Sequence, residues 1–427
     1  MSEGQGAGDG GRETPPGEPL TLTLLTTVDL SGRSGQNVAT REVVAALARR
    51  PGVALRVICP EPAAEFPEGL SREGVDWYWL PRKTASAAWH LRIQPTVARH
   101  LARTVVFDRP DALVVRLGPS TVLPAVAAVL ARVPFLALVR GTVVRNVTVR
   151  VPGPLAPFVR LAAAATLSPA DRIYAAYEEV RDELIALPGV SPAAVGVLTN
   201  GVDPDAFAPV ERARARESLG IDPDAFLVGV VGSFKRRHRL RELLWATRLL
   251  REEGLPVRAM LVGDGPRRGE LERFVAGLGL ESAVSMPGYV AHGELDRYLG
   301  ACDALYGVVP DARPSNPIKI YEYLASGRPV VTSDREEFAF VAEHATGVLV
   351  ESVSVAAVAD AIRELYEAGA SEREEMGRRG REYVLRHATW DDVVDVVLAD
   401  VSELRQSNRP RTGPIRTLPW RDGGIET

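Results

Sequence analysis

The sequence predicts an α/β protein made of two Rossmann-like domains that face each other across a cleft. This prediction rests on two observations. Short aliphatic runs typical of buried strands alternate with amphipathic stretches of helical period along most of the chain, which favours parallel sheets covered by helices on both faces. The chain has 427 residues, enough for two domains that each bury a hydrophobic core.

The composition excludes several classes of protein. The net charge is −4, with 46% hydrophobic and 25% charged residues, so no overall field favours nucleic acid. The sequence contains no run of about eighteen apolar residues, so no membrane-spanning helix is predicted. Cys59 and Cys302 are too far apart for a Cys-x-x-Cys site and are predicted to be buried free thiols of a cytoplasmic protein. Residues 1–19 are rich in glycine, proline and glutamate and lack the apolar core of a signal peptide. We therefore expect a disordered tail.

The first half opens with a strand–loop–helix unit. A buried strand is expected at 20–28 and an amphipathic helix at 38–50. Between them, Gly32 and Gly35 have G-x-x-G spacing, which is not the dinucleotide fingerprint and disfavours a nicotinamide-dependent dehydrogenase. The glycines mark either a tight turn or a close approach of the backbone to a ligand. Further strands are expected at 53–59, 76–80, 111–116, 135–139, 172–176 and 195–198. Helices are expected at 88–106, with a break at Pro95, and at 121–132, 161–165 and 178–187.

Arg140 follows the expected strand at 135–139, at the edge of the sheet where open α/β folds bind ligands. The stretch 145–160, which comes next, places arginines among apolar residues with glycine and proline breaks. It is either a loop that faces a lipid or an acceptor, or a solvated loop.

The second half repeats the pattern, so we expect domains at 20–204 and 205–390, a further helix at 391–404 and a disordered tail at 405–427. Strands are expected at 226–231, 258–262, 283–286, 304–309 and 330–331, and helices at 213–220, 240–253, 268–278, 293–301, 317–326, 355–367 and 372–387.

A basic loop follows the strand at 226–231. It combines Gly232, Ser233, Lys235 and His238 with three arginines. A charge run is usually a solvated surface, but a loop between a strand and a helix start also suits an anion.

The stretch 314–332 is expected to form a loop, a helix and a strand. Asn316 is a suitable N-cap and Pro317 suits the first helical position. Free N–H groups at a helix start favour a phosphate, and Lys319 lies in this first turn. Glu322 shares its face, so the two are either a surface ion pair or parts of a nucleotide site in which the glutamate binds ribose hydroxyls.

The lysine count favours the nucleotide site. Only Lys83, Lys235 and Lys319 are lysines among the 51 basic residues. Two of the three lysines fall in the two predicted anion loops, although all the other basic residues of the chain are arginines. A compact ammonium group beside a phosphate explains this choice, and two anion loops in one domain suit a nucleoside diphosphate.

Several short motifs occur in a characteristic order. They are the Gly32–Gly35 loop, Asn200–Asp203 with Phe207, Gly232–Lys235 with His238, Val262–Pro266, Gly288–Val290, Pro317–Tyr323 and Gly327–Val331. With these motifs the chain resembles the GT-B fold glycosyltransferases of family 4, over about residues 20–404.

The resemblance implies transfer of a sugar from a nucleotide-diphosphate sugar with retained configuration and without a metal or other cofactor. It places the donor on the C-terminal domain and a sugar, lipid or small-molecule acceptor on the N-terminal domain, to which the helix 391–404 would return. The catalytic residues it implies are Arg140, Lys235 and Glu322. The donor-binding residues it implies are Gly32, Gly35, Gly232, Ser233, Lys235, His238, Gly263, Ser315, Asn316, Pro317, Ile318, Lys319 and Glu322.

Three positions depart from the family pattern. Pro314 stands where the first glutamate of the Glu-x7-Glu motif is expected, Arg140 replaces a histidine and Ser233 replaces an arginine. The alternative is therefore a catalytically inactive GT-B protein that acts as a binding or partner subunit. We expect a cytoplasmic protein, with peripheral contact to the inner face of the membrane left open.

Overall fold

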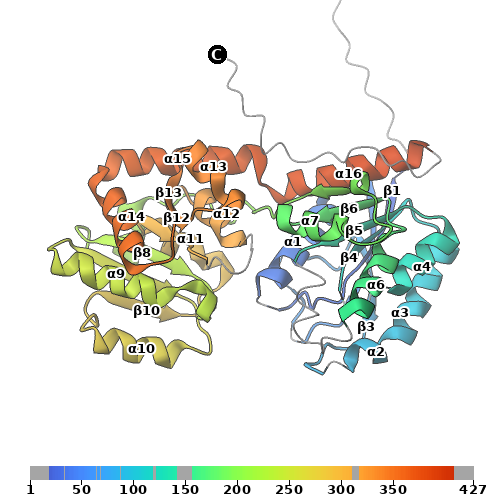
Figure 1. Cartoon of the computed structure of the whole chain (residues 1–427), viewed down its shortest axis with the longest axis horizontal. Coiled ribbons are helices and arrows are strands. Elements are labelled where there is room, and N and C mark those ends of the chain that lie inside the picture. Colours follow the sequence, from blue (N-terminus) through green and yellow to red (C-terminus); the bar gives the residue numbers. More distant parts are fainter. Residues whose placement is uncertain are drawn as a thin grey trace, which may run out of the picture.

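The computed structural model describes residues 19–407, apart from 33, 64, 68, 87, 119–121, 142–155 and 310–316. Its described part forms two lobes, each built around one parallel sheet (Figure 1). The prediction of an α/β protein with two Rossmann-like domains is therefore confirmed.

The N-terminal sheet has seven strands in the order β3-β2-β1-β4-β5-β6-β7, all parallel. The strands are β1 (Leu20–Leu25), β2 (Val53–Pro60), β3 (Val75–Leu80), β4 (Ala112–Arg116), β5 (Phe135–Val139), β6 (Arg172–Ala175) and β7 (Val195–Val197). The helices are α1 (Gly35–Arg49), α2 (Trp89–Arg92), α3 (Gln94–Leu101), the π-helix η1 (Ala102–Phe107), α4 (Val122–Ala131), α6 (Ala156–Leu167), α7 (Glu178–Ile185) and the short η3 (Pro192–Ala194).

The C-terminal sheet has six parallel strands in the order β10-β9-β8-β11-β12-β13. The strands are β8 (Phe226–Val231), β9 (Val257–Val262), β10 (Val284–Gly288), β11 (Ala304–Tyr306), β12 (Val330–Ser333) and β13 (Gly347–Val350). The helices are α8 (Arg212–Leu219), η4 (Arg236–His238), α9 (Leu240–Glu252), α10 (Arg268–Gly277), η5 (His292–Glu294), α11 (Leu295–Gly300), α12 (Ile318–Ala325), η6 (Glu336–Phe338), α13 (Ala339–Glu343), α14 (Val355–Glu367), α15 (Gly369–His387) and α16 (Trp390–Ser407).

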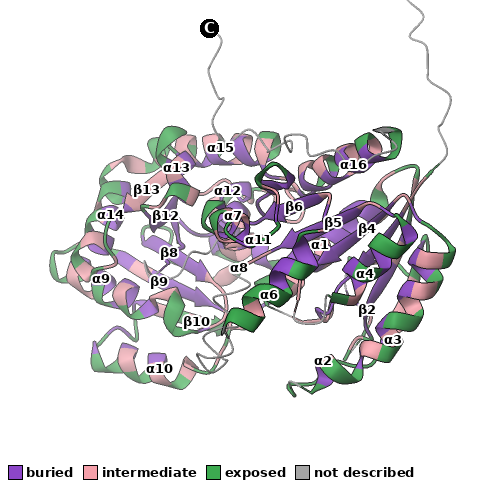
Figure 2. Ribbon diagram, turned by 45° about the vertical axis from the view of Figure 1, so that its right-hand side comes forward, coloured by how far each residue is buried: buried purple, intermediate pink, exposed green. Residues whose placement is uncertain are grey.

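Each sheet is covered on both faces, because its strands are apolar on both sides (Figure 2). On the N-terminal sheet, α3, η1, α4, α6 and α7 pack on one face, and α1 and α16 on the other. On the C-terminal sheet, α9, α10 and α14 pack on one face, and α11, α12, α13 and α15 on the other.

The chain crosses between the lobes at two adjacent segments. Val202 donates its N–H to the carbonyl of Ala388 at 2.9 Å and accepts from the N–H of Trp390 at 3.2 Å. A side chain at Gly201 would lie 2.5 Å from the backbone of Thr389, so only glycine fits there.

After the second crossing, α16 lies along the N-terminal lobe (Figure 1). Its Asp400 accepts a hydrogen bond from the hydroxyl of Tyr174 at 2.6 Å, and Arg50 donates to the carbonyl of Asp391 at 2.9 Å. The last helix of the chain thus ties the C-terminal half to the first domain.

The structure corrects two expected features and adds two elements that were not expected. The helix expected at 88–106, with a break at Pro95, is divided at Ile93 instead, and Pro95 lies in the first turn of α3, where its missing N–H costs nothing. Gly35 belongs to the first turn of α1 rather than to the loop. The strand β13 and the helix α13 were not predicted, because four and five residues are too few to show a period.

Candidate active site

The start of α12 is one residue later than predicted. Pro317 is the N-cap, with φ −73°, and the helix runs from Ile318 to Ala325. Asn316 and Ser315, predicted as N-cap and phosphate-binding residues, lie outside the described residues. Gly327 has φ +71°, the left-handed conformation in which a glycine commonly ends a helix.

Lys319 and Glu322 are half-buried and do not form the surface ion pair considered as an alternative. The Nζ atom of Lys319 is buried and has no hydrogen-bond partner among the described residues. Burial lowers the pKa of Lys319 to about 8, and the charge of Glu322 partly opposes this shift. Burial likewise raises the pKa of Glu322 to about 7. An ammonium group without a partner is well suited to an incoming anion.

The basic loop after β8 lies beside this helix start. Burial, followed by the charges of Lys319, Arg237 and Lys235, lowers the pKa of His238 to about 3. His238 is therefore neutral at pH 7, and its pKa is affected by both lysines that are predicted to bind an anion. Of these, Lys235 is exposed and Lys319 half-buried. The structure thus brings the two loops to the same part of the C-terminal domain.

Two glycines, Gly263 and Gly265, allow the loops after β8 and β9 to touch. A side chain at Gly263, where φ is +125°, would lie 2.1 Å from the carbonyl oxygen of Gly232. One at Gly265 would lie 2.6 Å from the backbone nitrogen of Phe234. Loop packing is therefore sufficient to explain Gly263. Its predicted contact with the donor stays a prediction.

The glycines after β1 are not explained by the packing of the loop alone. A side chain at Gly32 would lie 2.3 Å from Nδ2 of Asn37, the end of a flexible side chain that can move aside. Nothing lies within 4 Å of the equivalent point at Gly35. The packing therefore decides between the tight-turn and the ligand interpretation at neither glycine.

The N-terminal sheet presents buried cations at its carboxyl edge. Arg116 ends β4, and its Nε is buried without a hydrogen-bond partner in the described chain. Arg140 follows β5 and donates through Nη1 to the carbonyls of Leu198 at 2.7 Å and Thr199 at 3.0 Å, but its buried Nη2 has no described partner. Burial lowers the pKa of Arg116 to about 10 and that of Arg140 to about 9.

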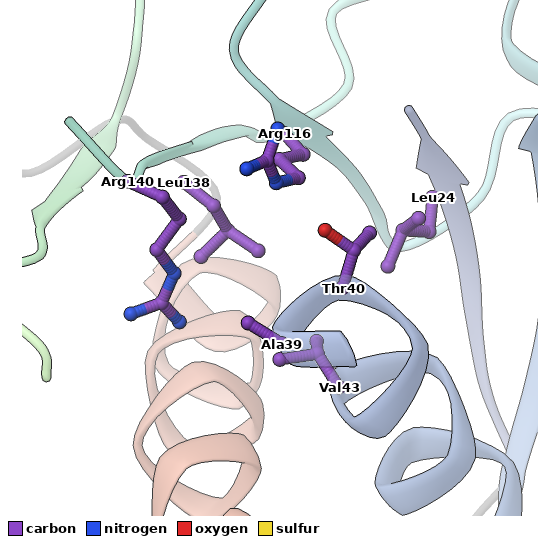
Figure 3. Close-up of a pocket in the computed structure, with 7 residues that line it drawn as sticks. All are labelled: Leu24, Ala39, Thr40, Val43, Arg116, Leu138 and Arg140. Atoms are coloured by element: carbon purple, nitrogen blue, oxygen red, sulfur yellow. The ribbon is translucent and has the colours of Figure 1, made fainter. Parts of the chain in front are cut away.

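Both guanidinium groups line a cavity under this edge, between the sheet and α1 (Figure 3). Its volume, about 10 Å³, is close to the smallest that holds one water molecule. The remaining lining residues are Leu24, Ala39, Thr40, Val43 and Leu138. Arg140 was predicted from its place after a strand, but its burial beside Arg116 was not.

Lys83 is a further cation of this edge that sequence reasoning missed. Its ammonium donates to the carbonyl of Thr27 at 2.9 Å and lies 5.7 Å from the centre of the Trp89 ring. Burial and the charge of Arg116 lower its pKa, although the nearby Asp29 opposes this. The rarity of lysine in the chain could have identified Lys83, since it is the third of only three.

The two halves of the site meet at α12. Ile318, at the start of that helix, packs into the same apolar cluster as Ala39 and Leu138 of the N-terminal domain. The charge of Glu42, on α1, helps to raise the pKa of Glu322, although burial is the main cause. The cations at the edge of one domain and the predicted anion loops of the other therefore border a common region.

Within the described ranges, no group of three or more His, Cys, Asp or Glu side chains is placed to hold a metal ion. A membrane-spanning helix is likewise not found in that part of the chain, because none of its helices is both long and apolar enough.

Comparison with known proteins gives matches in both halves. The family described as Glycosyltransferase Family 4 matches residues 33–206, and Glycosyl transferases group 1 matches residues 211–383. The D-inositol 3-phosphate glycosyltransferase of Gordonia bronchialis is 32% identical over 249 residues, which are 56% of this chain and 53% of that protein. The chain spans about half the length of the curated relatives it matches.

Solved structures share the whole fold at low identity. Sucrose-phosphate synthase from Thermosynechococcus elongatus matches 91% of this chain and 100% of its own, with a TM-score of 0.72 and 20% identity. HepE of Anabaena, in complex with UDP-glucose, matches 90% of this chain and 100% of its own, with a TM-score of 0.69 and 18% identity. With two sheets of seven and six parallel strands and a glycosyltransferase family matched in each half, the chain belongs to the GT-B fold glycosyltransferases of family 4.

Proposed function

We propose that this protein transfers a sugar, with retained configuration and without a metal, from a nucleotide-diphosphate sugar to an anionic acceptor. The observation that supports the donor most strongly is the buried Nζ of Lys319 at the start of α12, which has no hydrogen-bond partner among the described residues. The basic loop with Lys235 lies near it, since both lysines act on His238. Two cations that converge at a helix start are suited to a diphosphate. HepE, of the same fold, was solved with UDP-glucose, so a UDP-sugar is the first donor to test.

In the proposed reaction the bond between the anomeric carbon and the diphosphate oxygen breaks, and its electron pair leaves with the nucleoside diphosphate. The acceptor hydroxyl oxygen bonds to the anomeric carbon on the same face, and its proton passes to the departing phosphate. Lys235, Lys319 and the free N–H groups of α12 stabilise the charge that develops on the leaving group. Glu322 accepts hydrogen bonds from the ribose hydroxyls.

Metal independence follows, within this proposal, from the same cations. Ammonium groups and helix N–H groups supply the countercharge that a divalent ion would otherwise bring. A cationic site also repels a metal ion.

The acceptor is proposed to carry a phosphate or carboxylate. Arg116 is buried and Arg140 half-buried, neither has an acidic partner among the described residues, and Lys83 lies near Arg116. Such charges are costly unless an anion compensates them. The name of the Gordonia relative, an inositol 3-phosphate glycosyltransferase, is consistent with an acceptor of this class.

A second candidate is a binding or partner subunit without activity. Pro314, Arg140 and Ser233 favour it, because each replaces a residue of the family pattern. Transfer or hydrolysis of any nucleotide sugar by the purified chain would exclude it.

The donor site is tested by calorimetry with UDP, GDP and ADP. Lys319→Ala should weaken binding of the preferred nucleotide about tenfold or more, the scale of one charge-assisted contact. Lys83→Ala is the matched control, because it removes a lysine from the other domain and should leave nucleotide affinity unchanged. Equal affinity of wild type and Lys319→Ala would refute the donor site.

A further inference from the structure

The exposed apolar side chains of the described structure are concentrated on one face of the N-terminal domain. Of its 12 exposed large hydrophobic residues, 8 lie on α2, η1, α4 and α6. They are Leu91, Phe107, Val122, Val126, Val129, Leu130, Phe158 and Leu161. We call these side chains, with the helices that carry them and the adjoining α3, the α4–α6 face.

The sequence of α4 explains why its outer side is apolar. VLPAVAAVLA has no charged or polar side chain, and its alanines pack against the sheet. The outward stripe of Val122, Val126, Val129 and Leu130 has helical spacing, and Leu130 is 73% exposed. A helix that is apolar all round is normally buried. Among the described residues, α4 packs against the sheet on its inner side and against η1, α3 and α6 at its flanks, and its outer side is uncovered.

The neighbouring helix extends the stripe. On α6, Phe158 is 68% exposed and Leu161 62% exposed. The helices α3, η1, α4 and α6 pack beside one another on the same face of the sheet. Figure 2 shows their outward turns as exposed. The apolar side chains therefore share one surface rather than being scattered.

The charge of this face is of one sign. The helices α2, α3, η1, α4 and α6 contain no aspartate or glutamate, although the chain as a whole has 55 acidic residues against 51 basic ones. Exposed arginines accompany the apolar residues on these helices and at the end of α4. They are Arg92, Arg99, Arg103, Arg132 and Arg160. Asp108, which directly follows η1, is paired with Arg56 at 3.6 Å.

We propose that the α4–α6 face binds the surface of a bilayer that contains anionic lipids. The apolar stripe enters the boundary between headgroups and acyl chains, and the arginines contact lipid phosphates. A second copy of the chain fits less well, because a twofold interface would place this acid-free, arginine-bearing surface against itself. Anionic lipid supplies both an apolar phase and the missing negative charge.

The test is co-sedimentation of the full chain with vesicles of phosphatidylcholine, alone or mixed with phosphatidylglycerol. We expect binding to the mixed vesicles, weakened by added salt because exposed charges are screened. Leu130→Ser/Phe158→Ser should lower the partition coefficient at least tenfold. The matched control Leu385→Ser/Trp245→Ser changes two exposed apolar residues of the C-terminal domain and should bind as wild type does.

Charge is tested separately with Arg92→Gln/Arg99→Gln, which should remove most of the preference for phosphatidylglycerol. The altered side chains are exposed, so melting temperatures close to that of wild type establish that the variants fold. Absence of binding to both kinds of vesicle, or unchanged binding of Leu130→Ser/Phe158→Ser, would overturn the proposal. The proposal would also be overturned if light scattering showed a wild-type dimer that Leu130→Ser/Phe158→Ser dissociates.

Discussion

Two buried arginines, one in each domain, have opposite surroundings. In the C-terminal domain Arg216 donates through Nε to the carbonyl of Ala301 at 2.9 Å, through Nη1 to that of Pro223 at 2.6 Å and through Nη2 to the carboxylate of Asp303. In the N-terminal domain Arg116 has no hydrogen bond or ion pair with any described residue. The first arginine has its partners within the fold, whereas the second has none among the described residues.

The physical reason is the high cost of a buried charge without a partner. Asp303 also accepts from Arg212 and from the N–H of Leu227 at 2.7 Å, so that network is satisfied within the protein. Arg116 and Arg140, by contrast, lie at the carboxyl ends of β4 and β5 with buried nitrogen atoms that no described residue satisfies. Lys319 and Glu322 represent an intermediate case, because each influences the other without a hydrogen bond between them.

The largest effect is expected at the satisfied network. Asp303→Ala should lower the free energy of unfolding by about 3–5 kcal/mol, because Arg216 stays buried without its counter-ion. Urea denaturation followed by circular dichroism measures this loss. Asp303→Asn is the control and should cost less, since its amide oxygen still accepts from the Leu227 N–H. A loss below about 1 kcal/mol would mean that the two arginines do not differ as described.

An intermediate effect is expected at Glu322. Its pKa in the folded protein, about 7, lies above the ordinary value of 4.5, so the folded state holds a proton that the unfolded state releases. The stabilisation this gives is complete below pH 4.5 and is lost as the pH rises through about 7.

Glu322→Gln should remove this pH dependence, so that wild type becomes less stable than the variant by on the order of 1–2 kcal/mol near neutral pH. Unfolding free energies measured across the window test the prediction. Glu281→Gln, which alters an exposed carboxyl group, should give a profile parallel to that of wild type. The prediction would be contradicted if the pH profile of Glu322→Gln also ran parallel to that of wild type.

The smallest change in stability is expected at Arg116. Because no described group depends on it, Arg116→Met should change the free energy of unfolding by less than about 1 kcal/mol, or raise it. The same variant should lose transfer to an anionic acceptor while nucleotide affinity stays at the wild-type value. A strongly destabilised Arg116→Met would show that this arginine is part of the fold.

The sequence determined those features that depend on neighbouring residues. Alternation of strands and helices predicted both parallel sheets, and the two loops proposed to bind an anion were singled out because a loop, a helix start and a rare lysine are adjacent in the chain. Local signals were less reliable at boundaries. The start of α12 was placed one residue early, at Pro317, and the four residues of β13 were missed.

Only the tertiary structure decided which of these groups are buried, paired or facing each other. Arg116 and Arg140 are 24 residues apart in the chain and share a cavity because β4 and β5 are adjacent in the sheet. The arginines at 116 and 216 look alike in the sequence, and only the presence of Asp303 beside one of them makes their roles differ. Burial and pairing are sums over contacts between distant segments, so no local pattern contains them.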